Sequence, residues 1–147
     1  MSVRVLLADD QAPFRRAARA VLDAAVGFDL VGEAVSGEEA VALVESLRPD
    51  LVLMDITMVG LGGIEATRAI TASHPRTTAI LLSTYREEDL PVEARHCGAA
   101  GYLHKSDFGG PALLALWDGR PPTHAPRGRR SRPSPACASP SPTPDRA

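Results

Sequence analysis

The chain has 147 residues, enough for one compact domain and a tail but too few for two domains of ordinary size. A hydrophobic fraction of 44% with an aromatic share of 4% indicates a globular interior filled mostly by Ala, Val and Leu. The start of the chain has neither a leader peptide nor a run long enough to span a bilayer, so we expect no membrane contact and a cytoplasmic location.

The net charge of −2 hides a division of the chain into two parts. Residues 1–117 carry 10 basic and 16 acidic side chains, whereas residues 118–147 carry 6 basic and 2 acidic ones. The second part holds 8 of the 13 prolines and no Leu, Ile, Val, Phe, Met, Tyr or Trp, so it cannot bury enough apolar surface to order itself. We therefore expect one domain over residues 1–117 and a disordered tail over 118–147.

Short apolar runs typical of strands alternate with amphipathic helical segments along the predicted domain. The expected strands cover residues 3–8, 29–34, 51–54, 78–82 and 101–103. Apolar residues at three- and four-residue spacing predict helices between these strands. The alternation predicts an α/β fold with a parallel sheet covered on both faces. Such an open sheet has two common strand orders, and both place ligands outside the carboxyl ends of the strands.

Several residues mark the expected helix ends. Ser36, followed by two glutamates, predicts an N-cap for the second helix, and Pro49 predicts its end. Pro91 is expected in the opening turn of a fourth helix, which Gly98 would follow as a left-handed residue. A short fifth helix is expected within residues 107–117.

Three carboxylates fall at two of the predicted strand ends. Asp9 and Asp10 follow the first strand, and Asp55 follows the third. One residue of this kind is usually a turn or cap residue. Three that converge would repel one another by several kcal/mol unless a cation joined them, and Mg²⁺ prefers such oxygen ligands. If the first and third strands are neighbours, these residues predict a magnesium site.

Two further polar residues lie at strand ends. Lys105 follows the fifth strand and is the single lysine of the chain, and Ser83 ends the fourth strand. A loop lysine is usually solvated and a hydroxyl at this place usually caps a turn. Together with the carboxylates they would nevertheless supply a fixed cation and a hydrogen-bond donor at one edge of the sheet.

These motifs resemble the receiver domain of bacterial two-component response regulators. Their sequence is most similar to that of receivers that precede a helix-turn-helix output domain. The resemblance covers residues 3 to about 117 and rests on motifs in the right order and separation, namely Leu7-Ala8-Asp9-Asp10-Gln11, residues 49–56 (PDLVLMDI), Leu82-Ser83-Thr84-Tyr85 and residues 98–105 (GAAGYLHK). It implies a flavodoxin-like (βα)5 doubly wound parallel sheet with strand order 2-1-3-4-5.

The resemblance also implies a role for each acidic residue. Asp55 would be the phosphoacceptor that attacks a phosphoryl group carried by a histidine kinase or a small phosphodonor. Asp10 and Asp55 would bind Mg²⁺ directly, Asp9 would reach it through water, and Thr57 would contribute its backbone carbonyl. The metal would offset negative charge during phosphoryl transfer.

The same resemblance implies a switch. Lys105 would bind a phosphoryl oxygen, Ser83 would turn inward to donate a hydrogen bond to it, and the ring of Tyr85 would fill the vacated space. By itself, a tyrosine after a strand is more often a half-buried residue with its hydroxyl in water. The surface changed by phosphorylation would be that of the fourth helix, the fifth strand and the fifth helix. The expected partners are a sensor histidine kinase and a second copy of the chain bound through this surface.

The sequence departs from the family pattern in two places. The loop after Asp55 usually reads Met-Pro-x-x-Asp-Gly, whereas residues 58–63 read MVGLGG, so we expect a more mobile loop and weaker metal binding. Residues 118–147 have no pattern of a helix-turn-helix or other folded output, so we expect a stand-alone receiver without direct DNA binding. The arginine-rich run 127–132 could contact nucleic acid or an acidic partner by charge, although a solvated tail is the simpler interpretation.

Other functions are compatible with parts of the pattern. A haloacid-dehalogenase-like phosphatase is disfavoured, because it needs a second acid at the position of Thr57. A flavodoxin-like nucleotide binder is disfavoured too, because Asp9 and Asp10 would repel the phosphate that it binds after the first strand. Within the family, the chain could be a truncated or frameshifted DNA-binding transcriptional regulator, or a degenerate receiver that serves as an interaction module. We expect a phosphorylated signalling switch rather than an enzyme with turnover. Cys97 and Cys137 have neither metal nor disulfide spacing, so we expect both to be reduced.

Overall fold

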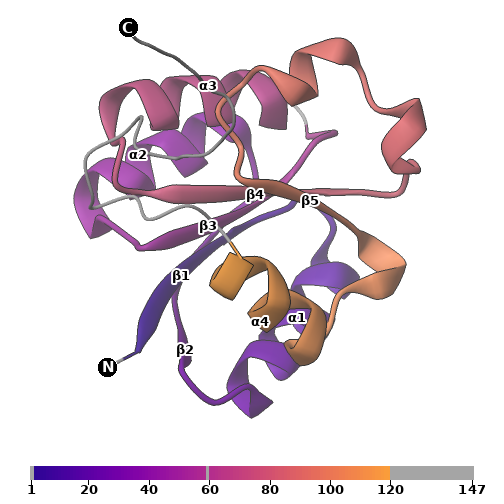
Figure 1. Cartoon of the computed structure of the whole chain (residues 1–147). Helices are drawn as coiled ribbons and strands as arrows, with labels where there is room; N and C mark the ends of the chain where they lie inside the picture. Colours follow the sequence, from indigo (N-terminus) through magenta and orange to yellow (C-terminus); the bar gives the residue numbers. More distant parts are fainter. Residues whose placement is uncertain (1, 59, 120–147) are drawn as a thin grey trace, which may run out of the picture.

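The computed structural model describes residues 2–58 and 60–119 and contains one parallel sheet of five strands (Figure 1). Their order is β2-β1-β3-β4-β5, which confirms the predicted flavodoxin-like order. All four strand pairs are parallel. The strands are β1 (Val3–Ala8), β2 (Phe28–Ala34), β3 (Leu51–Asp55), β4 (Thr78–Ser83) and β5 (Gly101–His104).

Helices cover both faces of this sheet. Figure 1 shows α2 and α3 on one face and α1 and α4 on the other. The helices are α1 (Ala12–Ala24), α2 (Gly37–Leu47), α3 (Gly63–Ser73) and α4 (Gly110–Gly119). Each pair encloses its own apolar core, with Leu6 and Met54 in the core under α2 and α3 and with Leu7 and Leu53 in the other. Neighbouring strand residues thus point to opposite faces, as the period of a strand requires.

Two of the three inner strands, β3 and β4, are continuous apolar runs, as expected for strands that helices cover on both faces. Every residue of β3 and β4 is buried. Parallel pairing aligns their carboxyl ends, with Ala8 opposite Met54, Asp55 opposite Leu82, and Ser83 opposite His104. The polar residues at or just after the carboxyl ends of β1, β3, β4 and β5 therefore meet at one edge of the sheet.

The second helix begins and ends where the sequence predicts. The N–H of Glu39 donates to Oγ of Ser36 at 3.1 Å, and the Glu39 carboxylate accepts the N–H of Val35 at 2.7 Å. These reciprocal bonds satisfy two backbone donors at the start of α2. The helix ends at Leu47, and Arg48 takes a left-handed conformation with φ 49 before Pro49.

The predicted fourth helix is wrong as an α-helix. Residues 86–97 form two short 3₁₀ helices, η1 (Glu87–Asp89) and η2 (Val92–Arg95), and not one continuous helix. Pro91 lies between them, and a residue before proline avoids the helical region, so Leu90 is extended with ψ 145. Gly98 does adopt the expected positive φ, of 95. The helix predicted as the fifth is α4 in the structure.

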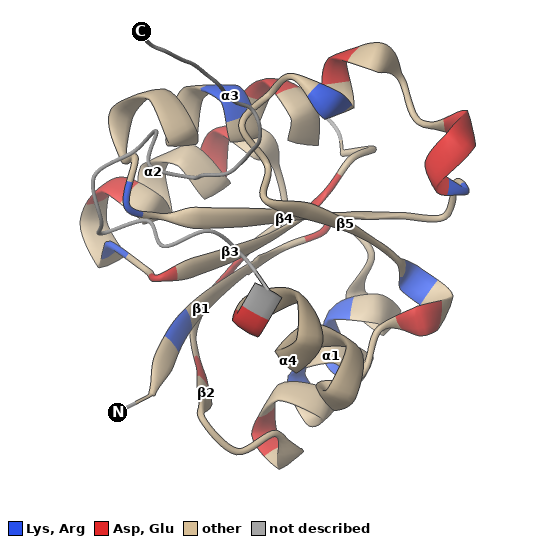
Figure 2. Cartoon of the chain, in the orientation of Figure 1, with Lys and Arg blue, Asp and Glu red and all other residues tan. Residues whose placement is uncertain are grey.

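The last described helix starts later than expected and continues further. The 3₁₀ helix η3 (Lys105–Asp107) leads from β5 toward α4, which begins at Gly110 and runs to Gly119, beyond the boundary expected at Trp117. In Figure 2 this helix is tan except near its end, in keeping with its place against the apolar face of the sheet. Across the described part of the chain, every helix is too short or too polar to traverse a bilayer. The tail predicted to be disordered lies, from residue 120 onward, outside the described residues.

Candidate functional site

The structure brings three carboxylates together at the carboxyl edge of the sheet. Asp9 and Asp10 come from the end of β1 and Asp55 from the last position of β3. One oxygen from each lies within 4.8 Å of the others. Asp9 is fully buried, Asp55 is 2% exposed, and Asp10 is accessible to solvent. The site therefore combines two buried acids with a third at its opening.

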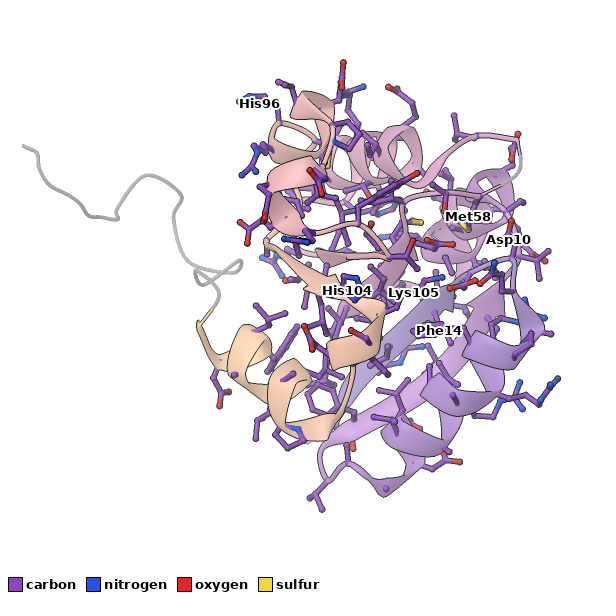
Figure 3. The ribbon with its side chains drawn as sticks, turned by 90° about the vertical axis from the view of Figure 1, so that its right-hand side faces the viewer. Asp10, Phe14, Met58, His96, His104 and Lys105 are labelled. Carbon is purple, nitrogen blue, oxygen red and sulfur yellow. The ribbon has the colours of Figure 1, made fainter. Side chains whose placement is uncertain are left out.

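Lys105 supplies the positive charge at this edge. Its Nζ lies 2.6 Å from Oδ2 of Asp9 and 3.3 Å from Oδ2 of Asp55, and its side chain is only 10% exposed. Figure 3 shows Lys105, the residue directly after β5, between His104 and Asp10 and above Phe14. Because a buried carboxylate is costly without a partner, the shared ammonium stabilises both acids in the folded chain.

An aromatic wall keeps this ammonium in place. Nζ of Lys105 lies 4.7 Å from the ring centroid of Phe14, which is within the range of a cation–π contact. The ring of Phe14 in turn lies 5.7 Å from that of Phe108 at an interplanar angle of 57°. Phe14 belongs to the first turn of α1 and Phe108 follows η3, so the start of a helix and a distant loop together enclose the lysine.

Burial shapes the acid chemistry of Asp55. Desolvation raises the pKa of Asp55 to about 6 from an ordinary 3.8, and the charge of Asp9 adds to the rise. The Lys105 ammonium and the N–H of Thr57, which donates to Oδ1 at 3.3 Å, act in the opposite direction. At neutral pH the side chain is mostly ionised, yet it is a more basic and therefore more nucleophilic carboxylate than a solvated one.

The donor set fits a hard divalent cation. Oδ1 of Asp9 accepts the N–H of Gln11 at 2.8 Å, but its buried Oδ2 makes no aligned hydrogen bond within the described part of the chain, although Lys105 lies beside it. Carboxylate oxygens with one member open to solvent are the ligands that Mg²⁺ takes while keeping several waters. Asp10 and Asp55 would hold such an ion, with Asp9 behind them and the exposed Thr57 next to them.

The glycine-rich loop after Asp55 is tied to α2 and α3. The carboxylate of Glu38 accepts the N–H of Leu61 at 3.1 Å, and Gly60 stands beside it with φ +71. A Cβ at Gly63 would lie 1.9 Å from the backbone oxygen of Asp55, so the first turn of α3 approaches the end of β3 as only glycine allows. The expected greater mobility of this loop stays a prediction.

A hollow of about 390 Å³ lies beside Ser83, and residues of β4, η1 and β5 line it. Ser83 is buried, and its Oγ accepts the N–H of Tyr85 at 2.8 Å. The ring of Tyr85 lines this hollow but is 50% exposed. Tyr102 of β5 lines it too, with its hydroxyl donating to the carbonyl of Ala94 at 2.7 Å. Two tyrosines thus stand near the hydroxyl predicted to switch.

Some residues of the site were not among the sequence predictions. Tyr102 and His104 stand in the motif that identified Lys105, and a polar histidine at the last position of a strand was the available signal. Glu38 was noted only as a helix-start acid, and Phe14 carried no signal because an apolar residue on a helix is ordinarily core. The predicted residues Asp9, Asp10, Asp55 and Lys105 lie together, and Ser83 lies at the adjacent strand end.

Comparison with known families agrees with this geometry. Residues 5–115 match the model of the response regulator receiver domain. The chain belongs to the response regulator receiver family. Among curated receiver proteins, it is 43% identical over 103 residues to response regulator UvrY of Escherichia coli K12 and 40% identical to response regulator GacA of Pseudomonas viridiflava. These matches cover 70% of this chain but 47% and 48% of the two relatives, so the chain spans about half their length.

Solved receiver structures have the same fold. The signal receiver domain of the putative response regulator NarL from Mycobacterium tuberculosis is 31% identical and superposes with a TM-score of 0.74, covering 81% of this chain and 98% of that one. The response regulator domain of Thermotoga maritima CheB is 30% identical with a TM-score of 0.73, covering 86% and 99%. The receiver of this chain is therefore a domain of two-component signal transduction.

Proposed function

We propose that this receiver accepts a phosphoryl group on Asp55 from the phosphohistidine of a sensor histidine kinase. The observation that carries the proposal is the position of Lys105, whose Nζ lies 3.3 Å from Oδ2 of Asp55 and is held by the buried Asp9. A fixed cation next to a carboxylate of raised pKa suits the transfer of an anionic group onto that carboxylate. Because the chain spans about half the length of the two curated relatives, any activity of the whole protein is also a proposal.

The transfer step follows from the residues at the edge. An oxygen of the ionised Asp55 attacks phosphorus, the bond between phosphorus and the imidazole nitrogen breaks, and the imidazole leaves neutral when its other nitrogen carries a proton. The product is an acyl phosphate on Asp55. Lys105 then lies beside a dianionic group, and its attraction to Asp9 keeps its ammonium from turning into solvent. Mg²⁺ held by Asp10 and Asp55 would supply charge neutralisation at the phosphoryl oxygens.

The proposed output is a change of surface. An acyl phosphate replaces the single negative charge of the ionised Asp55 with a group of roughly −1.5 to −2 charges and three acceptor oxygens, which favours a hydrogen bond from Ser83 and a rearrangement of the hollow beside it. Residues of β4, η1, β5 and η3 line this hollow, and along the chain η2 follows η1 and α4 follows η3. We place the binding of a partner, including a second copy of the chain, on the surface of η1, η2, β5 and α4.

Two tyrosine rings are candidates for filling the space that Ser83 leaves when it turns toward the phosphoryl group. Tyr85 is half exposed on the loop after β4, whereas Tyr102 stands on β5 and is anchored by its hydroxyl to Ala94. Either ring could enter that space. Tyr85→Ala and Tyr102→Ala decide between them, because only the variant that lacks the moving ring loses the change of surface on phosphorylation. We propose no turnover chemistry beyond transfer to and from Asp55, since Thr57 stands where a second acid would serve as general acid. We also propose that the reaction takes place in the cytoplasm.

The full chain should be incubated with acetyl phosphate and Mg²⁺ and followed by intact mass. We expect the mass of one phosphoryl group on the wild type, none on Asp55→Asn, and none on the wild type in EDTA. Ser46→Ala, at an exposed position of α2, serves as the unaffected control. A degenerate receiver would stay unmodified, and modification of Asp55→Asn at the wild-type rate would place the phosphoacceptor elsewhere.

A further inference from the structure

The imidazole of His104 joins two loops next to Lys105. Its Nε2 lies 2.9 Å from the carbonyl oxygen of Thr84, and its Nδ1 lies 3.1 Å from the backbone nitrogen of Ser106 and 2.8 Å from Oγ of Ser106. A carbonyl oxygen can only accept and a backbone N–H can only donate, so these contacts require the neutral tautomer with its proton on Nε2. The ring is a bridge of fixed polarity between the loop after β4 and the start of η3.

The bridge holds one particular peptide group. The carbonyl of Thr84 and the N–H of Tyr85 belong to the same planar peptide unit. His104 donates to its carbonyl end, and Oγ of Ser83 accepts from its N–H end at 2.8 Å. Ser83 and His104 are also register partners on β4 and β5. The switching hydroxyl and the histidine therefore hold a single rigid plane from its two ends.

The other end of the ring is anchored on the side of the lysine. The N–H of Ser106 donates to Nδ1 from within η3, which begins with Lys105. Because this anchor belongs to the segment that positions the ammonium, the ring cannot follow the Thr84 carbonyl when the loop after β4 moves. A rearrangement of residues 83–85 must then break the bond from Nε2.

We propose that His104 is a positioning residue that holds the peptide between Thr84 and Tyr85 in the unphosphorylated arrangement. The inference rests on the proposed function, in which Ser83 turns toward a phosphoryl group on Asp55. When Ser83 turns, its Oγ no longer accepts the N–H of Tyr85 in the same geometry. The peptide then shifts, and the hydrogen bond from His104 to the carbonyl of Thr84 opposes that shift. Loss of the histidine favours the phosphorylated arrangement. Since a neutral hydrogen bond at an exposed site has a modest net value, the effect is about threefold to tenfold in the equilibrium.

Two conservative variants separate the two halves of the bridge. The amide nitrogen of Gln reaches about as far as Nε2, so His104→Gln keeps a donor for Thr84. The amide oxygen of Asn lies near the place of Nδ1, so His104→Asn keeps the acceptor for Ser106 and loses the bond to Thr84. His104→Leu removes both contacts. The matched control is His96→Leu, an exposed histidine that Figure 3 places well away from His104 and Lys105.

The test measures the full chain with and without metal. Beryllofluoride with Mg²⁺ mimics the phosphoryl group, and its affinity is read from Trp117 fluorescence. Amide exchange of Tyr85 is read by NMR in EDTA. We expect His104→Asn and His104→Leu to bind beryllofluoride about threefold to tenfold more tightly and to exchange the Tyr85 amide faster by a similar factor. We expect His104→Gln and His96→Leu to stay within about twofold of the wild type on both measurements.

Equal or weaker beryllofluoride binding by His104→Asn, with wild-type exchange at Tyr85, overturns the role of His104. An equal change in His104→Gln also overturns it, because that variant keeps the proposed bond. If the wild type itself binds no beryllofluoride, the proposed function fails, and the exchange at Tyr85 in EDTA still decides whether His104 holds the loop. A misfolded His104→Leu leaves the comparison of the Gln and Asn variants intact.

Discussion

Nζ of Lys105 lies 2.6 Å from Oδ2 of Asp9, a side chain with no exposed surface. We expect Lys105→Gln to leave two close buried carboxylates without a compensating cation and to lower the free energy of unfolding by about 3 kcal/mol in EDTA. Urea unfolding at pH 7.5 measures the loss. Added Mg²⁺ should return part of it, because the ion would bind the folded acids.

The control for the lysine is Arg76→Gln, which removes an exposed positive charge before the start of β4, at the other end of that strand from Ser83. We expect it to change the free energy of unfolding by less than about 0.5 kcal/mol. Equal losses in the two variants would mean that Lys105 acts only through net charge.

The ionisation of Asp55 makes the free energy of unfolding depend on pH. Burial and Asp9 raise the pKa of Asp55 to about 6, so the folded chain binds a proton more tightly than the unfolded chain does. The contribution of this group to stability is therefore fully present below pH 3.8 and is lost as the pH rises toward 6. We expect Asp55→Asn to be more stable than the wild type by about 2 kcal/mol at pH 7.5 in EDTA. The fall in stability with rising pH that Asp55 causes should be absent from this variant.

Denaturant midpoints from pH 4 to 8 in EDTA measure this difference between wild type and variant. Addition of Mg²⁺ should stabilise the wild type and leave Asp55→Asn nearly unchanged. A variant that is less stable than the wild type at pH 7.5 would show that the Asp55 carboxylate is favourably paired and not repelled.

Asp10 separates metal binding from stability because it is the accessible acid of the three. We expect Asp10→Asn to weaken Mg²⁺ binding at least tenfold while changing the free energy of unfolding in EDTA by less than about 1 kcal/mol. Calorimetric titration of the full chain with MgCl₂ measures the affinity. Retention of wild-type affinity would place the ion away from Asp10.

Gly63 begins α3 directly above the strand that carries Asp55. A Cβ there would lie 1.9 Å from a backbone oxygen that cannot move without the strand, so we expect Gly63→Ala to cost about 3 kcal/mol or more. Gly62→Ala is the matched control, since the nearest atom that its Cβ would meet beyond the adjoining residues is the backbone oxygen of Ile56, at 3.7 Å. Thermal unfolding of both variants measures the difference, and similar midpoints would contradict this reading of the packing.

The sequence alone could predict the sheet and the acidic cluster because both follow from local patterns. Buried strands such as β3 and β4 are continuous apolar runs, and parallel pairing brings the residues after them to one edge. That rule alone places Asp55 near Asp9 once β1 and β3 are neighbours. It does not require knowledge of any side-chain packing.

Other features depend on contacts between distant segments. His104 meets Thr84 across 20 positions of sequence, and only the register of β4 with β5 brings them together. The fourth helix was predicted to open at Pro91 and to end before Gly98, but only the short 3₁₀ helix η2 forms there. In it the carbonyl of Ala94 accepts the hydroxyl of Tyr102 from β5, a contact between distant segments that a local pattern does not predict.

Tyr102 ties the short helices η1 and η2 to the sheet. Its hydroxyl donates to the carbonyl of Ala94 at 2.7 Å, and burial raises the pKa of this phenol above its ordinary 10.0, so the bond persists throughout the neutral range. We expect Tyr102→Phe to lose about 1 kcal/mol of stability and to speed amide exchange in residues 87–97 more than in β3. Hydrogen exchange read by mass spectrometry measures this contrast. Because the ring remains, uniform acceleration across the chain would mean global destabilisation and not release of η2, and unchanged exchange in residues 87–97 would mean that Tyr102 does not restrain this part of the proposed output surface.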